Sequence, residues 1–167
     1  MTQTSLKRQA KCQARGADEP AYGIWAAGTS YKARFDGGMT FYPCLGRDYP
    51  HNQPFAWRTL SVRVGALELW DEPAPTTTQG AYRFEYTNGS VREAYEVLAH
   101  GLEQTFVLAT RPAAAGDLVI RGRITTALHT APVREAVAPL VWSDANETPI
   151  LHYGQAIAID AHGDRFA

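Results

Sequence analysis

Residues 80–97, GAYRFEYTNGSVREAYEV, decide the fold. The first half alternates aromatic with charged or polar side chains, which is the two-residue period of a half-buried β-strand. Asn88-Gly89 then favours a two-residue hairpin turn, because both residues tolerate a positive φ angle. We therefore predict that Tyr82–Tyr86 and Val91–Tyr95 pair as antiparallel strands.

A turn at Asn88-Gly89 also predicts which side chains lie opposite each other. Opposite-charge and aromatic pairs stabilise antiparallel strands, and this register produces both kinds. The expected pairs are Glu85 with Arg92, Tyr86 with Val91, and Tyr82 with Tyr95. The same register places the carboxyl group of Glu93 opposite Phe84, on an otherwise aromatic face.

Short runs of the same type occur along the rest of the chain, separated by Gly, Pro, Asn and Asp. Tyr31–Phe35 and Met39–Tyr42 predict a hairpin around Asp36-Gly37-Gly38. The extended run Phe55–Trp70 is expected to have a bulge or a bend at Gly65. Further strands are predicted at Leu102–Ala109, Leu118–Thr126, Val133–Val141 and Gln155–Asp160.

Helices are not expected, because no window has a capped stripe of helical period. The prolines of Asp71–Gly80 predict a loop that holds neither a helix nor a central strand. About nine or ten short strands at this spacing predict an all-β fold, a two-sheet antiparallel β-sandwich of jelly-roll type.

The composition is that of an ordinary globular protein, with 45% apolar and 20% charged residues. Its 167 residues fit one domain, which we place at 21–167 after a flexible arm at 1–20. Because 16 basic residues balance 17 acidic ones, net charge favours neither nucleic acid nor a membrane surface. The chain contains no signal peptide and no apolar run of membrane-spanning length.

The two cysteines leave two alternatives open. Cys12 and Cys44 form one disulfide if the arm folds back on the domain, and otherwise remain two thiols. Neither alternative decides the cellular compartment.

Six short segments of Gly80–Gly163 follow one another in a moderately specific order and spacing: Val91–Tyr95, Gly101–Leu108, Arg111-Pro112, Gly116–Ile120, Tyr153-Gly154 and Ile159–Gly163. On these segments, the stretch resembles a domain found ahead of FG-GAP or related β-propeller repeats in large secreted bacterial proteins. Residues 42–46 match more loosely. This resemblance implies an extracellular or cell-surface location, and a protein partner such as downstream repeats or another surface protein. It brings no catalytic residues with it. The chain departs from the pattern by lacking an export signal and by stopping at Ala167, so we expect a fragment of a longer protein.

Glu93 is the first candidate for a functional acid. If Leu98–Gly101 is a four-residue loop, Glu93 also faces Phe106, and a carboxylate between two phenylalanines is desolvated. A buried Glu is often held by an arginine, here Arg83, Arg121 or Arg123, and we expect an arginine or backbone donors to hold it.

The same loop sets Glu96 opposite Glu103, which is repulsive unless a cation intervenes. A loop one residue longer sets Tyr95 opposite Glu103 instead, and the repulsion favours that alternative.

A glycoside hydrolase would need two carboxyl groups held across one sugar, and Glu93 with Glu103 are the candidates for catalysis. Glu96 and Asp160 add further acids, but no local signature accompanies them. The five histidines lack zinc-site spacing, and no nucleotide or acyl-transfer motif is present, so we expect no metal and no cofactor. Calcium ligation by Asp36, Asp71 or Asp160 has no support beyond residue type.

Four tryptophans, Trp25, Trp57, Trp70 and Trp142, suggest platforms for sugar rings, although most are expected in the core. Weighing these features, we expect a non-enzymatic accessory, assembly or adhesion-like module. The alternatives are a carbohydrate-binding module and a glycoside hydrolase. Glycan is thus a possible ligand, whereas nucleic acid binding and membrane insertion are not expected.

Overall fold

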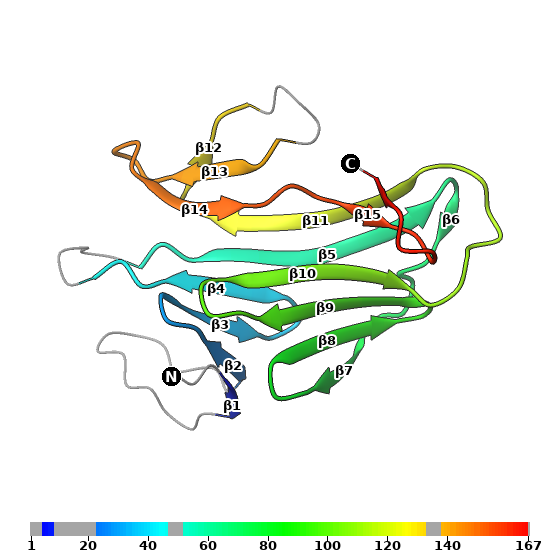
Figure 1. Ribbon diagram of the computed structural model, residues 1–167, viewed down its shortest axis with the longest axis horizontal. Coiled ribbons are helices and arrows are strands. Elements are labelled where there is room, and N and C mark those ends of the chain that lie inside the picture. Colours follow the sequence, from blue (N-terminus) through cyan, green and yellow to red (C-terminus); the bar gives the residue numbers. More distant parts are fainter. Residues whose placement is uncertain (1–4, 9–22, 47–51, 133–137, 167) are drawn as a thin grey trace. The chain divides into compact units, whose positions relative to one another are not determined.

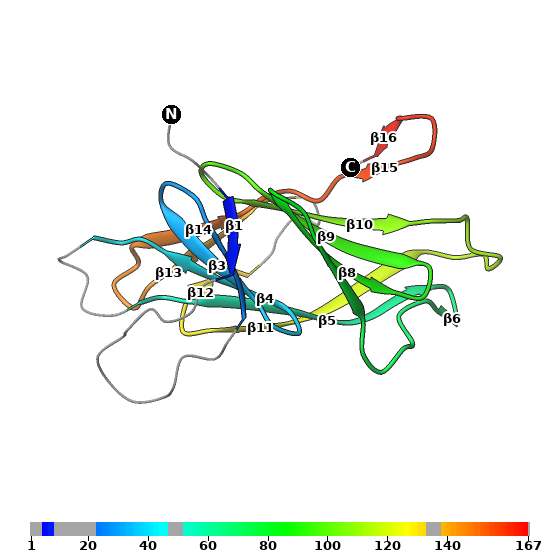
Figure 2. The same ribbon diagram turned by 90° about the horizontal axis from the view of Figure 1, so that it is seen from below.

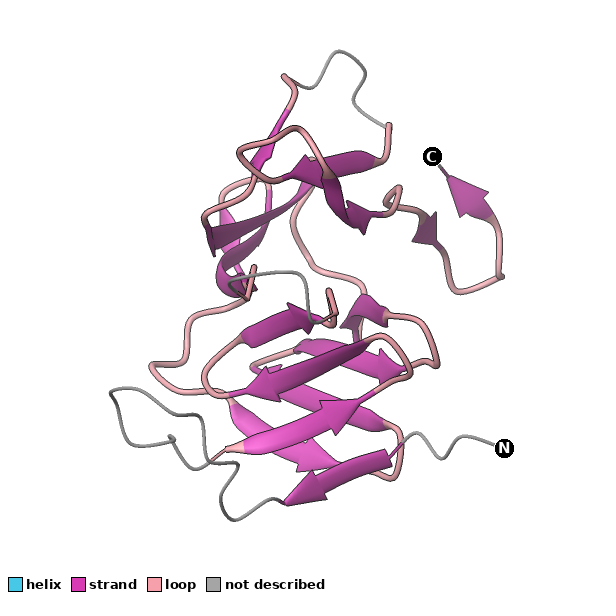
Figure 3. Cartoon of the chain, turned by 90° about the vertical axis from the view of Figure 1, so that its left-hand side faces the viewer, coloured by secondary structure: helices cyan, strands magenta, loops and turns pink. Residues whose placement is uncertain are grey.

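The computed structural model describes residues 5–8, 23–46, 52–132 and 138–166 (Figure 1). Every regular element in these ranges is a strand, as Figure 3 shows, which confirms the predicted all-β class. The strands are more numerous and shorter than predicted. They are β1 (Ser5–Arg8), β2 (Ile24–Ala27), β3 (Tyr31–Phe35), β4 (Met39–Pro43), β5 (Phe55–Val64), β6 (Leu67–Glu68), β7 (Thr76–Gln79), β8 (Arg83–Asn88), β9 (Val91–Val97), β10 (Leu102–Leu108), β11 (Leu118–Thr126), β12 (His129–Thr130), β13 (Leu140–Ser143), β14 (Pro149–Tyr153), β15 (Ala158–Ile159) and β16 (Arg165–Phe166).

The chain divides into two compact units, Met1–Thr125 and Thr126–Ala167. In the first unit, a seven-stranded sheet has the order β1-β2-β3-β4-β5-β11, with β6 paired to β5. A second, four-stranded sheet has the order β10-β9-β8-β7; the two sheets are seen edge-on in Figure 2. The second unit consists of the sheet β12-β13-β14 and the hairpin β15-β16.

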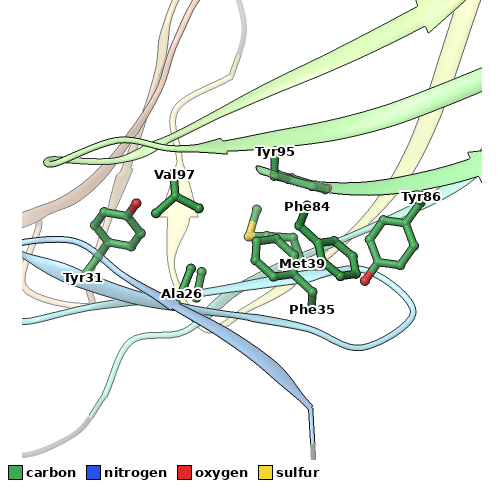
Figure 4. Close-up of a cluster of buried hydrophobic side chains, with 9 residues drawn as sticks. Ala26, Tyr31, Phe35, Met39, Phe84, Tyr86, Tyr95 and Val97 are labelled. Carbon is green, nitrogen blue, oxygen red and sulfur yellow. The ribbon is translucent and has the colours of Figure 1, made fainter. Parts of the chain in front are cut away.

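The core of the first unit lies between its two sheets. Side chains from the larger sheet and from β8 and β9 point toward one another (Figure 4). The rings of Phe35 and Phe84 stack across the interface, with centroids 4.5 Å apart. Each fully buried ring of this size stabilises the fold by about 1.5–3 kcal/mol. The cluster contains Ala26, Tyr31, Ala33, Phe35, Met39, Phe84, Tyr86, Tyr95 and Val97.

The β8–β9 hairpin forms, but its predicted turn is wrong by one residue. Asn88 pairs with Val91, so the turn is Gly89-Ser90, and Gly89 has a φ of 57°. The buried Asn88 amide explains the shift, because it accepts a hydrogen bond from the N–H of Glu72 (3.0 Å) and donates one to its carbonyl (2.9 Å). The side chain that favoured a turn instead holds a neighbouring loop.

The shifted turn changes cross-strand partners without changing faces. Each residue of β8 meets a β9 residue two positions beyond the predicted one, and a shift of two keeps the side-chain alternation. Glu93 therefore lies opposite Tyr86 instead of Phe84. Glu85 lies opposite Ala94, although its carboxylate is still 3.6 Å from Arg92 Nη1 on the diagonal.

The loop between β9 and β10 has four residues, so the longer loop that we favoured is wrong. Val97 pairs with Leu102, and Glu96 lies opposite Glu103. The expected repulsion is offset because the guanidinium group of Arg83 binds the carboxylate of Glu96.

The remaining predicted segments agree with the structure to different degrees. The hairpin of β3 and β4 forms as predicted, and Gly65 makes a tight turn into β6 with a φ of 56°. The proline-containing loop holds β7, which is an exposed edge strand and therefore compatible with the prolines. Within Gln155–Asp160 only Ala158–Ile159 is a strand, and part of Val133–Val141 lies outside the described residues.

The expected N-terminal arm is only partly described. Ser5–Arg8, placed in that arm from the sequence, pairs with β2 as strand β1. Among the described residues, no helix is long and apolar enough to cross a membrane.

Candidate functional site

The carboxyl group of Glu93 is the centre of a buried polar network in the first unit. Glu93 lies in the middle of β9, between Tyr86 on β8 and Phe106 on β10, and its side chain is only 2% exposed. The predicted aromatic surroundings are therefore present, with Tyr86 in place of Phe84.

Three uncharged side chains donate hydrogen bonds to this carboxylate. Thr59 Oγ1 donates to Oε2 at 2.7 Å, while Tyr95 Oη and Gln104 Nε2 donate to Oε1 at 2.5 and 2.7 Å. The Gln104 amide also lies 3.0 Å from the Tyr95 hydroxyl. Both carboxylate oxygens thus have partners, as a buried charge requires.

The network joins the two sheets. Thr59 belongs to β5 of the seven-stranded sheet, whereas Glu93 and Gln104 belong to the four-stranded sheet. The chain of bonds continues from Thr59 to the indole of Trp57, whose Nε1 donates to Thr59 Oγ1 at 3.0 Å. The arrangement is therefore a polar link across a largely apolar interface.

Trp57 has space for this bond because a glycine lies beneath its ring. A Cβ atom placed on Gly122 of β11 would come within 2.1 Å of the indole of Trp57. Gly122 therefore positions the indole, and through it the hydroxyl of Thr59.

We expected an arginine or backbone donors to hold Glu93, and this prediction is wrong, because among the described residues its carboxylate accepts hydrogen bonds only from the side chains of Thr59, Tyr95 and Gln104. Arg83 lies opposite Glu96, on the other face of the four-stranded sheet. It forms ion pairs there with Glu85 (2.5 Å) and Glu96. The hydrogen bond from Arg83 holds the pKa of Glu85 below its ordinary value. Arg121 and Arg123 belong to the exposed edge strand β11.

The second candidate for catalysis, Glu103, does not share a face with Glu93. Glu103 is exposed and lies opposite Glu96, whereas Phe106 is the β10 residue opposite Glu93. Because strand side chains alternate between faces, Glu103 and Glu96 point away from the core. These carboxyl groups therefore cannot flank one sugar together with Glu93.

Asp160 belongs to the second unit and holds a turn. Its Oδ1 accepts hydrogen bonds from the N–H groups of Asp164 (2.9 Å) and His162 (2.8 Å). The bond from Asp164 is the largest cause of a lowered pKa at Asp160.

The remaining candidates do not gather into a site. Among the described residues, no three His, Cys, Asp or Glu side chains are placed to hold a metal ion, and His51 lies outside those residues. Trp57 and Trp70 pack against the core cluster, while Trp25 stacks on Tyr42 at 5.6 Å. Cys44 is exposed, and Cys12 is not among the described residues, so the disulfide stays a prediction.

Two tyrosines add polar links between the same sheets. The hydroxyl of Tyr31 on β3 lies 2.8 and 2.7 Å from the carbonyl oxygens of Leu98 and Gly101, which bound the β9–β10 loop. Tyr86 on β8 donates to the carbonyl of Gly38 at 2.7 Å and accepts from its N–H at 3.1 Å. Burial raises the pKa of Tyr31 to about 12 and raises that of Tyr86 as well.

Thr59, Gln104 and Tyr31 were not identified from the sequence. Thr59 is the polar member of an inward series that begins with Phe55 and Trp57, a pattern that marks a polar residue on a buried face. Gln104 lies opposite Tyr95, and only the four-residue loop reveals that pairing. A search of family models, curated proteins and solved structures found no match to this chain.

Proposed function

We propose that the chain is a non-catalytic β module that serves as an accessory or assembly unit of a larger extracellular bacterial protein. In this proposal the first unit is a two-sheet β-sandwich whose stability comes from its core and from the polar links across it. The observation that carries the proposal is the enclosure of Glu93, whose two carboxylate oxygens are bonded to residues of both sheets.

The enclosure argues against general acid catalysis by Glu93. A general acid must reach the substrate oxygen within hydrogen-bond distance, and glycoside hydrolysis needs a second carboxyl group across the sugar. Glu93 is 2% exposed, and Glu103 lies on the opposite face of the sheet. We therefore assign Glu93 to the stability of the module.

The extracellular role rests on the resemblance of Gly80–Gly163 to domains that precede propeller repeats. The partner in this proposal is a protein, either such repeats or another surface protein. The open reading frame around the chain discriminates between a structural module and an enzyme. Propeller-like repeats after Ala167 and an upstream export signal favour the module, and a catalytic domain in the same frame would count against it.

The test of the proposal compares wild type with Glu93→Gln on a panel of chromogenic glycosides and on thermal unfolding. We expect no turnover from either protein, and a lower melting temperature for the variant because its amide cannot accept all three hydrogen bonds. Hydrolysis by wild type that disappears in a fully folded Glu93→Gln would replace the module with a hydrolase. Glu103→Gln is the matched control, because it removes an exposed carboxylate from the same sheet.

A further inference from the structure

The charges of the first unit are segregated, although the whole chain has a net charge of −1. Strands β2, β3, β4, β5 and β11 of the seven-stranded sheet contain no aspartate or glutamate. The same strands contain six basic residues, Lys32, Arg34, Arg58, Arg63, Arg121 and Arg123. These five strands are therefore strongly basic although the total charge of the chain is balanced, and the one described acid on a strand of this sheet is Glu68 of β6.

Strand register places five of these cations on the outer face. Ala33 and Phe35 point into the core, so Lys32 and Arg34 point outward. Trp57 also faces inward, so its neighbour Arg58 points outward. A Cβ on Gly122 would meet Trp57, so Gly122 faces the inner side of β11, and its neighbours Arg121 and Arg123 point outward. The basic face is defined by Lys32, Arg34, Arg58, Arg121 and Arg123.

The cations on β5 and β11 lie on neighbouring strands. Gly65, just after β5, donates its N–H to the carbonyl of Asp117, just before β11, at 3.2 Å. The end of β5 thus meets the start of β11, and the two strands run antiparallel. Paired strands lie about 4.8 Å apart, and alternate residues along a strand about 6.8 Å apart, so these guanidinium groups form a closely spaced array.

Most of the basic face is not neutralised within the described residues. Lys32, Arg58, Arg121 and Arg123 are exposed, and they form no ion pair with any described part of the chain. Arg34 forms one ion pair, in which its Nη2 lies 3.7 Å from Oδ2 of Asp36. Repulsion among uncompensated like charges costs stability, and a bound polyanion relieves it.

We propose that the basic face binds an anionic polysaccharide, one whose sugar units carry carboxylate or sulfate groups. Four of the five cations are arginines, whose planar guanidinium groups form paired hydrogen bonds with such anions. The stacked rings of Trp25 and Tyr42 lie on the same face, where Tyr42 pairs with Lys32 and Trp25 with Arg34. They provide the apolar surface on which the C–H side of a sugar ring packs.

A polysaccharide fits this face better than a single-stranded nucleic acid. Sequence-tolerant binding of single strands combines a basic groove with several aromatic side chains on which successive bases stack. On the described part of this face, the strand register places one aromatic pair, Trp25 and Tyr42, whose rings stack on each other. The inference goes beyond the proposed function and does not depend on the fate of Glu93.

The test measures binding of the full chain to immobilised heparin and alginate, with neutral dextran and oligothymidylate as comparisons. We expect binding to the anionic polysaccharides at about 50 mM salt that weakens steeply with added salt, as counterion release requires. Arg121→Ser with Arg123→Ser should weaken it about tenfold or more, because two contacts are lost. Replacing both residues by lysine should restore only part of the affinity, because lysine keeps the positive charge but cannot form the paired hydrogen bonds of a guanidinium group.

The matched control is Arg92→Ser with Arg111→Ser, which removes two arginines of the first unit that lie outside the seven-stranded sheet and gives the same net charge as Arg121→Ser with Arg123→Ser. This control should bind within about twofold of wild type, since net charge alone acts weakly at these salt concentrations. Three outcomes would overturn the proposal: no binding to either polysaccharide, equal loss in both serine pairs, or tighter binding of oligothymidylate than of heparin. Circular dichroism of each variant checks that the fold is intact.

Discussion

Thr59 on β5 donates a hydrogen bond of 2.7 Å to the carboxylate of Glu93 on β9, and this bond crosses the interface between the two sheets of the first unit. It lies in the buried interior, where an unpaired polar group costs more than at the surface. The pair therefore favours one relative placement of the two sheets over displaced alternatives.

Tyr31 is predicted to make the fold sensitive to alkaline pH. Burial raises its pKa from 10.0 to about 12, so the folded state holds the proton more tightly than the unfolded chain. The resulting stability is complete below pH 10 and is lost as the pH rises toward 12. Tyr31→Phe should lower the unfolding free energy by about 1–2 kcal/mol at neutral pH and flatten this alkaline decline.

Chemical denaturation across this pH range measures both effects of Tyr31→Phe. The exposed Tyr82 supplies the control, and Tyr82→Phe should change the unfolding free energy by less than about 0.5 kcal/mol. An unchanged alkaline profile in Tyr31→Phe would contradict the assignment, because Tyr31 would then contribute nothing to the pH dependence.

Arg83 is predicted to make the fold sensitive to acid. Its hydrogen bond lowers the pKa of Glu85 below 4.5, so the associated stability is present above that pH and is lost as the pH falls through the depressed value. Arg83→Met should therefore lower stability at neutral pH and reduce the loss below pH 4.5.

The Arg83 variant also leaves Glu96 and Glu103 facing each other without a cation. Adding Glu103→Gln to Arg83→Met should recover part of the lost stability, because the repulsion is removed. Urea unfolding at neutral and acid pH measures these differences, with Arg111→Met as an exposed control. If the added Glu103→Gln lowers stability further, Arg83 does not act by offsetting this repulsion.

Gly122 is predicted to be intolerant of a side chain. An added Cβ would lie 2.1 Å from the Trp57 ring, and forcing extra atoms into a packed site costs about 1–3 kcal/mol. Gly122→Ala should also displace the indole from Thr59 and change the tryptophan fluorescence. Gly101→Ala is the control, since a Cβ there meets no described atom within 4 Å. Equal stability of the two variants would contradict the packing argument.

The strand pattern was readable from the sequence because a period of two depends only on which faces are buried. The all-β class, the hairpins of β3–β4 and β8–β9, and the bounds of β11 follow from that alternation and from glycine turns. The turn residue was mispredicted because Asn88 has a long-range partner, the backbone of Glu72, that no local pattern contains. Turn prediction from neighbouring residues does not include such a long-range hydrogen bond.

The partners of Glu93 could not be predicted for a related reason. Burial of Glu93 followed from its face, but Thr59 comes from the opposite sheet, and sheet packing is not encoded in strand alternation. The arginine prediction used charge pairing, whereas three neutral donors satisfy the carboxylate. Likewise, the balanced total charge concealed the basic face until the strands were placed.

A double-mutant cycle between Thr59 and Glu93 tests most directly whether their bond links the sheets. Thr59→Val removes the hydroxyl at constant shape, and Glu93→Met keeps a long unbranched side chain without the carboxylate. The account predicts that Thr59→Val costs about 1–3 kcal/mol in wild type and much less in the Glu93→Met background, giving a coupling free energy of about 1 kcal/mol or more. Effects that add to within about 0.5 kcal/mol would show that the two residues do not stabilise the fold together, and would contradict the account.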